Sequence, residues 1–381
     1  MGLILGVDAI RPPLTGIGRY TWELAKHFSE GDYGFGDLRF FSAGKWIVDP
    51  SLLLTPTPKR ASRNKLKKIF NPPASVRTWR LKRAMRHSLF HSPNYFLPEL
   101  VDGGVVTIHD LSVFKYPETH PVERIRHFER SFESTLNRTC HIITDSEAIR
   151  EEVSSFFGWA KERITAIHLG VPDEFRPYEA ASLAAPLAEI GLSPGSYTLC
   201  VSTLEPRKRI DRLLDAYCQL PIGIRTRYQL VLAGSSGWLS EALREKIRCG
   251  ESEGWLRYMG FVPEVSLPAL YAGAHAFFFP SLYEGFGLPV LEALASGVPT
   301  LTSNCSSLPE VADGAAWLVE PDDHDALRLG IEKVISDDEW RATAMKRGVE
   351  VAGNMTWQQC AQRTVAVYQS LNGTDLLRQR A

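Results

Sequence analysis

Short apolar runs alternate with amphipathic stretches along nearly the whole chain. In the first half, the runs LILGVD and HIITDS are each followed by a stretch with apolar residues at helical spacing, IGRYTWELAKHF and EAIREEVSSFF. In the second half, YQLVLAG and HAFFFPS are followed in the same way by WLSEALREKIRC and LPVLEALASG. This alternation is typical of parallel strands joined by crossover helices. The sequence therefore predicts an α/β fold with doubly wound parallel sheets.

The length and one interruption of the pattern predict two such domains. The chain has 381 residues, more than the roughly 250 to 300 at which a single hydrophobic core stops growing. After Gly170 the alternation pauses in VPDEFRPYEAASLAAPLAEIGLSPGS, which is rich in Pro and Ala. We expect domains at 1–175 and 176–355, and a final segment, 356–381, that forms a helix near or across the domain junction. Because ligands bind at the carboxyl ends of parallel strands, the two sets of strand-end loops should face one cleft.

The composition limits the class of protein. A formal net charge of -1, with 44% hydrophobic and 23% charged residues, is that of a globular protein and gives no sign of nucleic-acid binding. No stretch approaches the roughly 20 apolar residues needed to span a bilayer. The six cysteines lie far apart without a Cys-x-x-Cys pair, which predicts reduced core thiols and a cytoplasmic location.

The segment PSLYEGFGLPVLEALASG has the features of an anion-binding loop. It predicts a strand, a loop with Gly285 and Gly287, and a helix that begins near Leu288 with a proline in its first turn. The start of such a helix attracts an anion, and the glycines let that anion approach the backbone. The acids Glu284 and Glu292 beside it suit sugar hydroxyls. The alternative is a structural strand-turn-helix with an acid that favours the helix dipole.

A second strand-end loop is basic. In CVSTLEPRKRIDRLL, Arg207, Lys208 and Arg209 follow a predicted strand that ends near Ser202. Cations at this position could converge on a diphosphate. The alternative is a solvated basic turn. Because both this loop and the loop at Glu284 lie at strand ends, each makes a binding role for the other more credible.

These motifs resemble the retaining GT-B glycosyltransferases of family 4. The resemblance rests on PRK after a strand and on EGFGLPVLE, in which seven residues separate Glu284 from Glu292, and it extends from GVDAIRPPLTGIGRYTWEL to AAWLVEPDD. It implies a GT-B fold, with two Rossmann-like domains facing across a cleft, of which the first (1–175) binds the acceptor and the second (176–355) binds the nucleotide sugar. It also implies that Arg207 and Lys208 grip the diphosphate of a nucleotide-sugar donor, that Glu284 contacts the donor sugar, and that Glu292 contacts the ribose.

The resemblance also gives roles to His109 and Asp110 in the first half of the chain. His109 and Asp110 follow the apolar run GGVVTI, where a His-Asp pair alone could be structural, a metal ligand or a sugar contact. The resemblance implies that His109 contacts the reacting sugar, with Asp110 in support. It implies the following donor-binding residues: Gly16, Gly18, Thr203, Arg207, Lys208, Phe261, Val262, Glu284, Gly285, Phe286, Gly287, Leu288 and Glu292.

The loop TGIGRY contains two glycines, and its residues alone do not show what it binds. Gly16 and Gly18 alone are weak evidence for dinucleotide binding, because Thr21 replaces the third glycine of that fingerprint. In the resembled family this loop lies under the donor phosphates and beside the acceptor. Arg19 could add a charge there or could be a surface arginine.

No metal or other cofactor is expected. Asp323-His324-Asp325 has the DxD pattern of metal-dependent glycosyltransferases of another fold, but it precedes the helical stretch ALRLGIEKV, and capping of that helix explains it better.

One interval is strongly basic. Positions 50–98 contain no Asp or Glu but many Lys and Arg between Lys59 and Arg86, with Leu66, Phe70 and Trp79 among them. This predicts peripheral contact with an anionic membrane at the inner face of the plasma membrane. Nucleic-acid binding is the competing interpretation, but no nucleic-acid module is recognisable.

The substrates follow from the resemblance alone. EPRK and VTIHDLSVF look like bacterial mannosyltransferases that use GDP-mannose to extend a lipid-linked saccharide, as in O-antigen assembly. Two alternatives stay open: a nucleotide-sugar epimerase on the same architecture, and a non-catalytic subunit that binds glycan or membrane.

Overall fold

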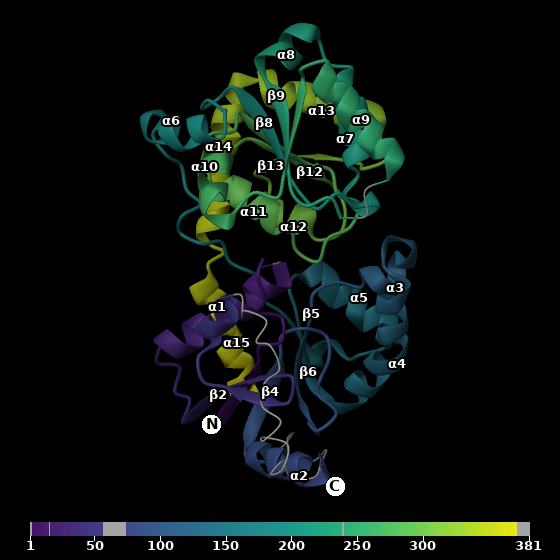
Figure 1. Ribbon diagram of the computed structural model, residues 1–381, viewed down its shortest axis with the longest axis vertical. Helices are drawn as coiled ribbons and strands as arrows, with labels where there is room; N and C mark the ends of the chain where they lie inside the picture. Colours follow the sequence, from purple (N-terminus) through teal and green to yellow (C-terminus); the bar gives the residue numbers. More distant parts are fainter. Residues whose placement is uncertain (1, 15, 56–73, 238–239, 372–381) are drawn as a thin grey trace, which may run out of the picture.

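The computed structural model of the protein describes residues 2–14, 16–55, 74–237 and 240–371, which fold into two α/β domains stacked end to end (Figure 1). The first domain has a seven-stranded sheet in the order β3-β2-β1-β4-β5-β6-β7. Its strands are β1 (Gly2–Gly6), β2 (Asp37–Ser42), β3 (Lys45–Ile47), β4 (Ser88–Ser92), β5 (Gly104–Ile108), β6 (Thr139–Thr144) and β7 (Ile164–Ala166). Its helices are α1 (Gly16–Glu30), α2 (Ala74–Met85), α3 (Ser112–Lys115), α4 (Val122–Arg138) and α5 (Glu147–Phe157).

The second domain has a six-stranded sheet in the order β10-β9-β8-β11-β12-β13, parallel throughout. Its strands are β8 (Tyr197–Val201), β9 (Gln229–Ala233), β10 (Leu256–Gly260), β11 (Ala276–Phe279), β12 (Thr300–Ser303) and β13 (Ala316–Val319). The helices from the linker onward are α6 (Ala180–Glu189), α7 (Ile210–Cys218), α8 (Ile222–Arg227), α9 (Glu241–Ser252), α10 (Leu267–Ala272), α11 (Leu288–Ala295), α12 (Leu308–Ala312), α13 (His324–Ser336), α14 (Asp338–Gly353) and α15 (Trp357–Ser370).

The short strand β3 departs from the expected parallel pattern, because it pairs antiparallel with β2 at the edge of the first sheet. Ala43 and Gly44 connect the two strands, and both have positive φ, 47° and 80°. Two consecutive positive φ angles are what a tight hairpin turn needs, so the chain reverses here without a crossover helix.

Alternate residues of β1 belong to opposite faces of the first sheet. Leu3 and Leu5 pack in the cluster that contains α1 and α15, whereas Ile4 packs in the cluster that contains α4 and α5. A strand buried on both faces reads as a continuous apolar run, which explains LILG in the sequence. Helices therefore cover both faces of the sheet, as the alternation predicted.

In each sheet the strand order reverses at one point, between β1 and β4 in the first domain and between β8 and β11 in the second. Loops that leave the sheet on either side of such a reversal open a crevice at the carboxyl ends of the strands. The fold thus provides two crevices, one for each sheet.

The chain crosses between the domains a second time before α15. This helix packs against α1 of the first domain (Figure 1), and Tyr368 on it lies 2.5 Å from Nδ1 of His91 in β4. At the crossing, a Cβ atom on Gly170 would lie 2.0 Å from the backbone nitrogen of Trp357. Only glycine allows the two crossing segments to approach so closely.

The cysteines and the helix lengths also bear on the predictions from the sequence. Cys140, Cys200 and Cys360 are buried thiols as predicted, but Cys218 and Cys249 are exposed, because each lies on the outer side of its amphipathic helix. Within the described ranges, every helix is too short or too polar to cross a membrane.

Candidate functional site

A cavity of about 430 Å³ lies between the two domains. It is lined from the first domain by the loop after β1 and by residues that follow β5 and β6, and from the second domain by the ends of β8 and β9 and the loop after β11. These are strand-end loops of both sheets, at the place where doubly wound domains bind ligands.

Serine side chains fix the loop between β11 and α11. The Ser307 hydroxyl lies 2.9 Å from the carbonyl oxygen of Glu284 and 2.7 Å from that of Phe286, and Ser306 bonds to the backbone of Glu284. Gly287 then turns the chain into α11 with a φ of 115°, which other residues rarely adopt. The Glu284 side chain is therefore held on a rigid backbone at the edge of the cavity.

This loop touches the first domain at Gly285. A Cβ atom there would lie 1.9 Å from the carbonyl oxygen of His109. The Ser146 hydroxyl, at the N-cap of α5, donates to the Gly285 carbonyl over 2.9 Å. The contact between the domains at the cavity therefore needs glycine at this position.

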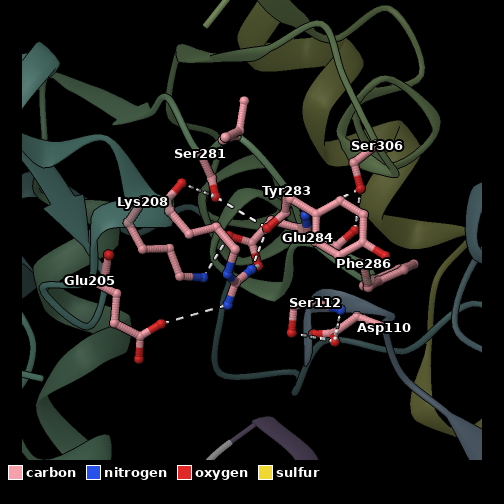
Figure 2. A network of polar contacts seen from close by, with 12 residues as sticks. Asp110, Ser112, Glu205, Lys208, Ser281, Tyr283, Glu284, Phe286 and Ser306 are labelled. Carbon is pink, nitrogen blue, oxygen red and sulfur yellow. Dashed lines mark hydrogen bonds and ion pairs between the residues drawn. The ribbon is translucent and has the colours of Figure 1, made fainter. Parts of the chain in front are cut away.

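The basic loop that follows β8 faces Glu284. Arg207 and Lys208 lie in a short 3-10 turn, η5 (Pro206–Lys208), and Nζ of Lys208 is 2.5 Å from Oε1 of Glu284. Nη1 of Arg207 donates to the Tyr283 carbonyl and is 3.4 Å from Oε2 of Glu284. Figure 2 shows Lys208 and Glu284 pointing toward each other. Burial alone would raise the pKa of Glu284, but the charges of Lys208 and Arg207 hold that pKa below its usual value.

Asp110 lies on the opposite side of this network. Its Oδ1 accepts hydrogen bonds from the backbone nitrogen and the hydroxyl of Ser112, at 2.9 and 2.6 Å. Burial would raise the pKa of Asp110, but the charge of Arg207 and the bonds from Ser112 lower it. The two domains thus interact through opposite charges at the cavity.

His109 has both ring nitrogens engaged inside the first domain. Its Nε2 is 2.9 Å from the Pro93 carbonyl oxygen, which can only accept, so Nε2 carries a hydrogen. Its Nδ1 is 2.7 Å from Oδ2 of Asp145. Burial would lower the pKa of His109, but the charge and hydrogen bond of Asp145 and the bond to Pro93 raise it. Burial also raises the pKa of Asp145, and the two hydrogen bonds fix the orientation of the His109 ring at the cavity wall.

Arg19 connects α1 to the second domain. It is 8% exposed, and its guanidinium lies 2.5 Å from Oε1 of Glu292 and 2.7 Å from Oε1 of Glu264. Arg19 is therefore a buried charge at the cavity and not a surface arginine. Its ion pair with Glu292 on α11 joins the two domains. Burial raises the pKa of Glu292 above its usual value, although Arg19 opposes the shift.

The cavity brings together most residues predicted from the sequence. Its lining includes Gly16, Arg19, His109, Asp110, Thr203, Lys208, Phe261, Val262, Glu284, Gly285, Phe286, Gly287, Leu288 and Glu292. Gly18 is buried within α1, and Arg207, 9% exposed, is buried behind the lining with its guanidinium turned to Tyr283 and Glu284. Asp323 of the DxD pattern caps α13 by accepting from the Ala326 nitrogen at 2.9 Å, as predicted.

Three residues of the site and its interface were missed in the sequence. Asp145 directly follows β6, so the strand-end rule applied to HIITDS could have found it. The Tyr283 hydroxyl accepts from the Leu111 nitrogen at 2.9 Å and donates to Glu152 at 2.6 Å. Glu310 on α12 accepts from the first two backbone nitrogens of α5. No local pattern identifies Tyr283 or Glu310, because their partners belong to the other domain.

Each half of the chain matches a glycosyltransferase family model. Residues 14–175 match the model described as "Glycosyltransferase Family 4". Residues 192–350 match the model described as "Glycosyl transferases group 1".

Individual proteins extend this similarity to the whole length. The chain is 36% identical over 382 residues to an O-antigen chain mannosyltransferase B of Escherichia coli, covering 97% of this chain and 100% of the relative. The structure resembles the sucrose-phosphate synthase of Thermosynechococcus elongatus (TM-score 0.68, 21% identity, 97% and 99% of the two chains). It also resembles HepE of Anabaena, solved with UDP and glucose (TM-score 0.71, 17% identity, 97% and 100% of the chains). These structural likenesses confirm the predicted GT-B architecture.

The assignment of Asp145 as a group that raises the pKa of His109 predicts the effect of Asp145→Asn. The substitution removes the charge that opposes burial, so the pKa of His109 should fall from above the usual histidine value to below it. Histidine-selective ¹⁵N NMR over a pH titration measures this pKa. His91 serves as an internal control, because burial lowers its pKa to about 3 and it should stay neutral between about pH 5 and pH 8 in both proteins. An unchanged His109 titration in Asp145→Asn would contradict the assignment.

Proposed function

Because the chain belongs to glycosyltransferase family 4 and is a glycosyltransferase, we propose that it transfers mannose from GDP-mannose to a hydroxyl group of a lipid-linked glycan. Transfer would retain the anomeric configuration and serve bacterial polysaccharide assembly such as that of O-antigen. The observation that carries the proposal is the pairing of Lys208 with Glu284 at the cavity between the domains, with Arg207 buried directly behind them. The name of the full-length relative supports mannose as the sugar.

In the proposed complex the donor diphosphate contacts Lys208, and Arg207 contributes its charge from behind the cavity wall. Lys208 already carries its charge at the cavity edge, and a diphosphate oxygen can share the ammonium with Glu284. The Glu284 carboxylate, held ionised by these cations, accepts hydrogen bonds from hydroxyls of the sugar. Glu292 would accept from the ribose hydroxyls, with Arg19 remaining beside it as a counter-charge.

The reaction breaks the bond between the anomeric carbon and the diphosphate oxygen, and forms a bond from that carbon to the acceptor oxygen. The acceptor proton passes to an oxygen of the leaving diphosphate. Negative charge grows on this oxygen as the bond breaks, so Lys208 and Arg207 stabilise the transition state more than the ground state. His109, whose ring is held by Asp145 and Pro93, lines the cavity on the side of the first domain.

Calorimetric titration with GDP, UDP, GDP-mannose and UDP-glucose, each with magnesium and with EDTA, tests the donor site. We expect GDP and GDP-mannose to bind in both buffers, because side-chain cations supply the charge that a metal would supply. Binding of the uridine pair alone would replace the proposed donor, and binding only with magnesium would contradict the metal-free site. Consumption of GDP-mannose without any acceptor would favour a hydrolase or epimerase.

Glu284→Gln tests the sugar contact. The amide keeps the shape of the side chain but loses the charge that pairs with Lys208, so kcat should fall by about a hundredfold. Glu241→Gln, which changes an exposed carboxylate on α9, is the matched control and should leave kcat unchanged. Near-normal turnover of Glu284→Gln would remove Glu284 from the mechanism.

The proposed membrane contact rests on the basic interval from Lys59 to Arg86. Lys59, Arg60, Arg63, Lys65, Lys67 and Lys68 lie outside the described residues. On α2, Arg80, Lys82 and Arg83 are exposed, and the Trp79 side chain is 59% exposed. In Figure 1, α2 lies at the end of the first domain away from the second domain. A basic surface with an exposed tryptophan suits the headgroup region of an anionic bilayer.

The double variant Arg80→Glu with Arg83→Glu tests this contact. Each cation near an anionic surface contributes about 1 kcal/mol, so two charge reversals should weaken co-sedimentation with phosphatidylglycerol vesicles by at least about tenfold. The matched control reverses two exposed arginines of α9, Arg244 and Arg248. Equal loss in both double variants would point to net charge instead of α2, and no loss in either would contradict the contact.

A further inference from the structure

Tyr283 is a residue of the second domain whose side chain packs in the core of the first domain. It lies on the loop after β11, directly before Glu284. Tyr283 is 2% exposed and belongs to the hydrophobic cluster that contains residues of β5, β6, α4 and α5. Its ring centroid is 5.3 Å from that of Tyr116 and 4.9 Å from the ammonium nitrogen of Lys115. Among the described residues of that cluster, Tyr283 is the one that the second domain supplies.

The Tyr283 hydroxyl bonds to two groups of the first domain. It accepts from the Leu111 nitrogen at 2.9 Å, at the start of α3, and donates to Oε2 of Glu152 on α5 at 2.6 Å. The other oxygen of Glu152 accepts from Lys115 at 2.6 Å, so the carboxylate is held in place. Burial and the bond to Glu152 raise the pKa of Tyr283 above its usual value, so the hydroxyl keeps the hydrogen that it donates.

The backbone of the same residue bonds to the proposed donor site. Nη1 of Arg207 donates to the Tyr283 carbonyl and lies 3.4 Å from Oε2 of Glu284. On the other side, Leu111, whose amide bonds to the hydroxyl, directly follows Asp110 in the cavity lining. Tyr283 therefore connects the first-domain wall of the cavity to the charged residues of the second domain, through its hydroxyl at one end and its carbonyl at the other.

We propose that Tyr283 is a positioning residue for the transfer reaction, and that its hydroxyl holds the first domain in register with Arg207 and Glu284. Lys208 and Glu284, which would hold the donor, both belong to the second domain, so nucleotide binding does not need this contact. Transfer does need it, because the first-domain wall that carries Asp110 completes the cavity around the reacting sugar. This assignment rests on the proposed function, because it presupposes a sugar donor in the cavity.

Tyr283→Phe tests the hydroxyl alone, because the phenylalanine ring can still pack in the first domain. Tyr217→Phe is the matched control. Tyr217 is also buried, but its hydroxyl bonds to Thr198 and to the Tyr228 carbonyl, both within the second domain. A third variant, Glu152→Ala, removes one of the two partners of the Tyr283 hydroxyl from the first domain.

Three quantities are measured on the full-length proteins. Calorimetry gives the Kd of GDP, and GDP release from GDP-mannose with octyl mannoside as acceptor gives kcat. Hydrogen exchange, measured without nucleotide, gives the exchange rates of the Leu111 and Ala148 backbone amides. Ala148 reports a separate contact between the domains, because its nitrogen donates to Glu310 on α12 at 3.1 Å.

In Tyr283→Phe, exchange at Leu111 and at Ala148 should become about tenfold faster and kcat should fall about tenfold, because losing a hydrogen bond to a charged group loosens the contact between the domains. The Kd of GDP should stay within about twofold of the wild-type value, which also shows that the variant is folded. Glu152→Ala should have a smaller effect that does not add to that of Tyr283→Phe. Tyr217→Phe should change neither the two exchange rates nor kcat.

Faster exchange at Leu111 alone, with the Ala148 rate unchanged, would show a purely local hydrogen bond and overturn the positioning role. So would a kcat equal to that of Tyr217→Phe, or a Kd of GDP that rises as much as kcat falls. The exchange rates need no substrate, so they decide whether Tyr283 holds the domains together whichever substrates the wild type uses. A wild type that binds neither GDP nor GDP-mannose would instead contradict the proposed function.

Discussion

The close approach of Gly285 to the carbonyl of His109 is the contact on which the rest of the site depends. It brings the loop after β11 onto the strand ends of the first domain, where Ser146 and Tyr283 fasten it. The same approach brings Asp110 of the first domain close enough for the charge of Arg207 to lower its pKa. A backbone contact of this kind tolerates no side chain, which is why a glycine stands between the glutamate and the helix that follows.

Once the domains meet, the buried charges must find partners. Lys208 pairs with Glu284 and Arg19 with Glu292, and the second pair joins residues of different domains. A buried charge without a partner would cost several kcal/mol, so Lys208 and Glu284 compensate each other within the second domain, and Arg19 and Glu292 compensate each other across the cleft. The proposed donor site is in this sense already arranged for its ligand.

The two sheets divide the proposed chemistry between them. The second sheet places cations and an acid at its strand reversal, between β8 and β11, and these suit a nucleotide diphosphate sugar. The first sheet contributes His109, Asp110 and Asp145, which follow β5 and β6 and line the same cavity. The His109 ring is bonded to the Pro93 carbonyl through Nε2 and to Asp145 through Nδ1.

The sequence by itself determined the fold class, the two-domain organisation and the strand-end loops that carry Glu284, Lys208 and His109, because hydrophobic periodicity and the turn residues around it are local properties. It also identified Asp323 as a helix cap, for the same reason. Only the tertiary structure decided that Arg19 pairs with Glu292, that Asp145 holds His109, that Arg207 lies behind the cavity wall and that Gly18 is buried away from it. Each of these depends on which residues, distant in sequence, meet when the sheets form and the domains dock, and local spacing along the chain does not specify those contacts.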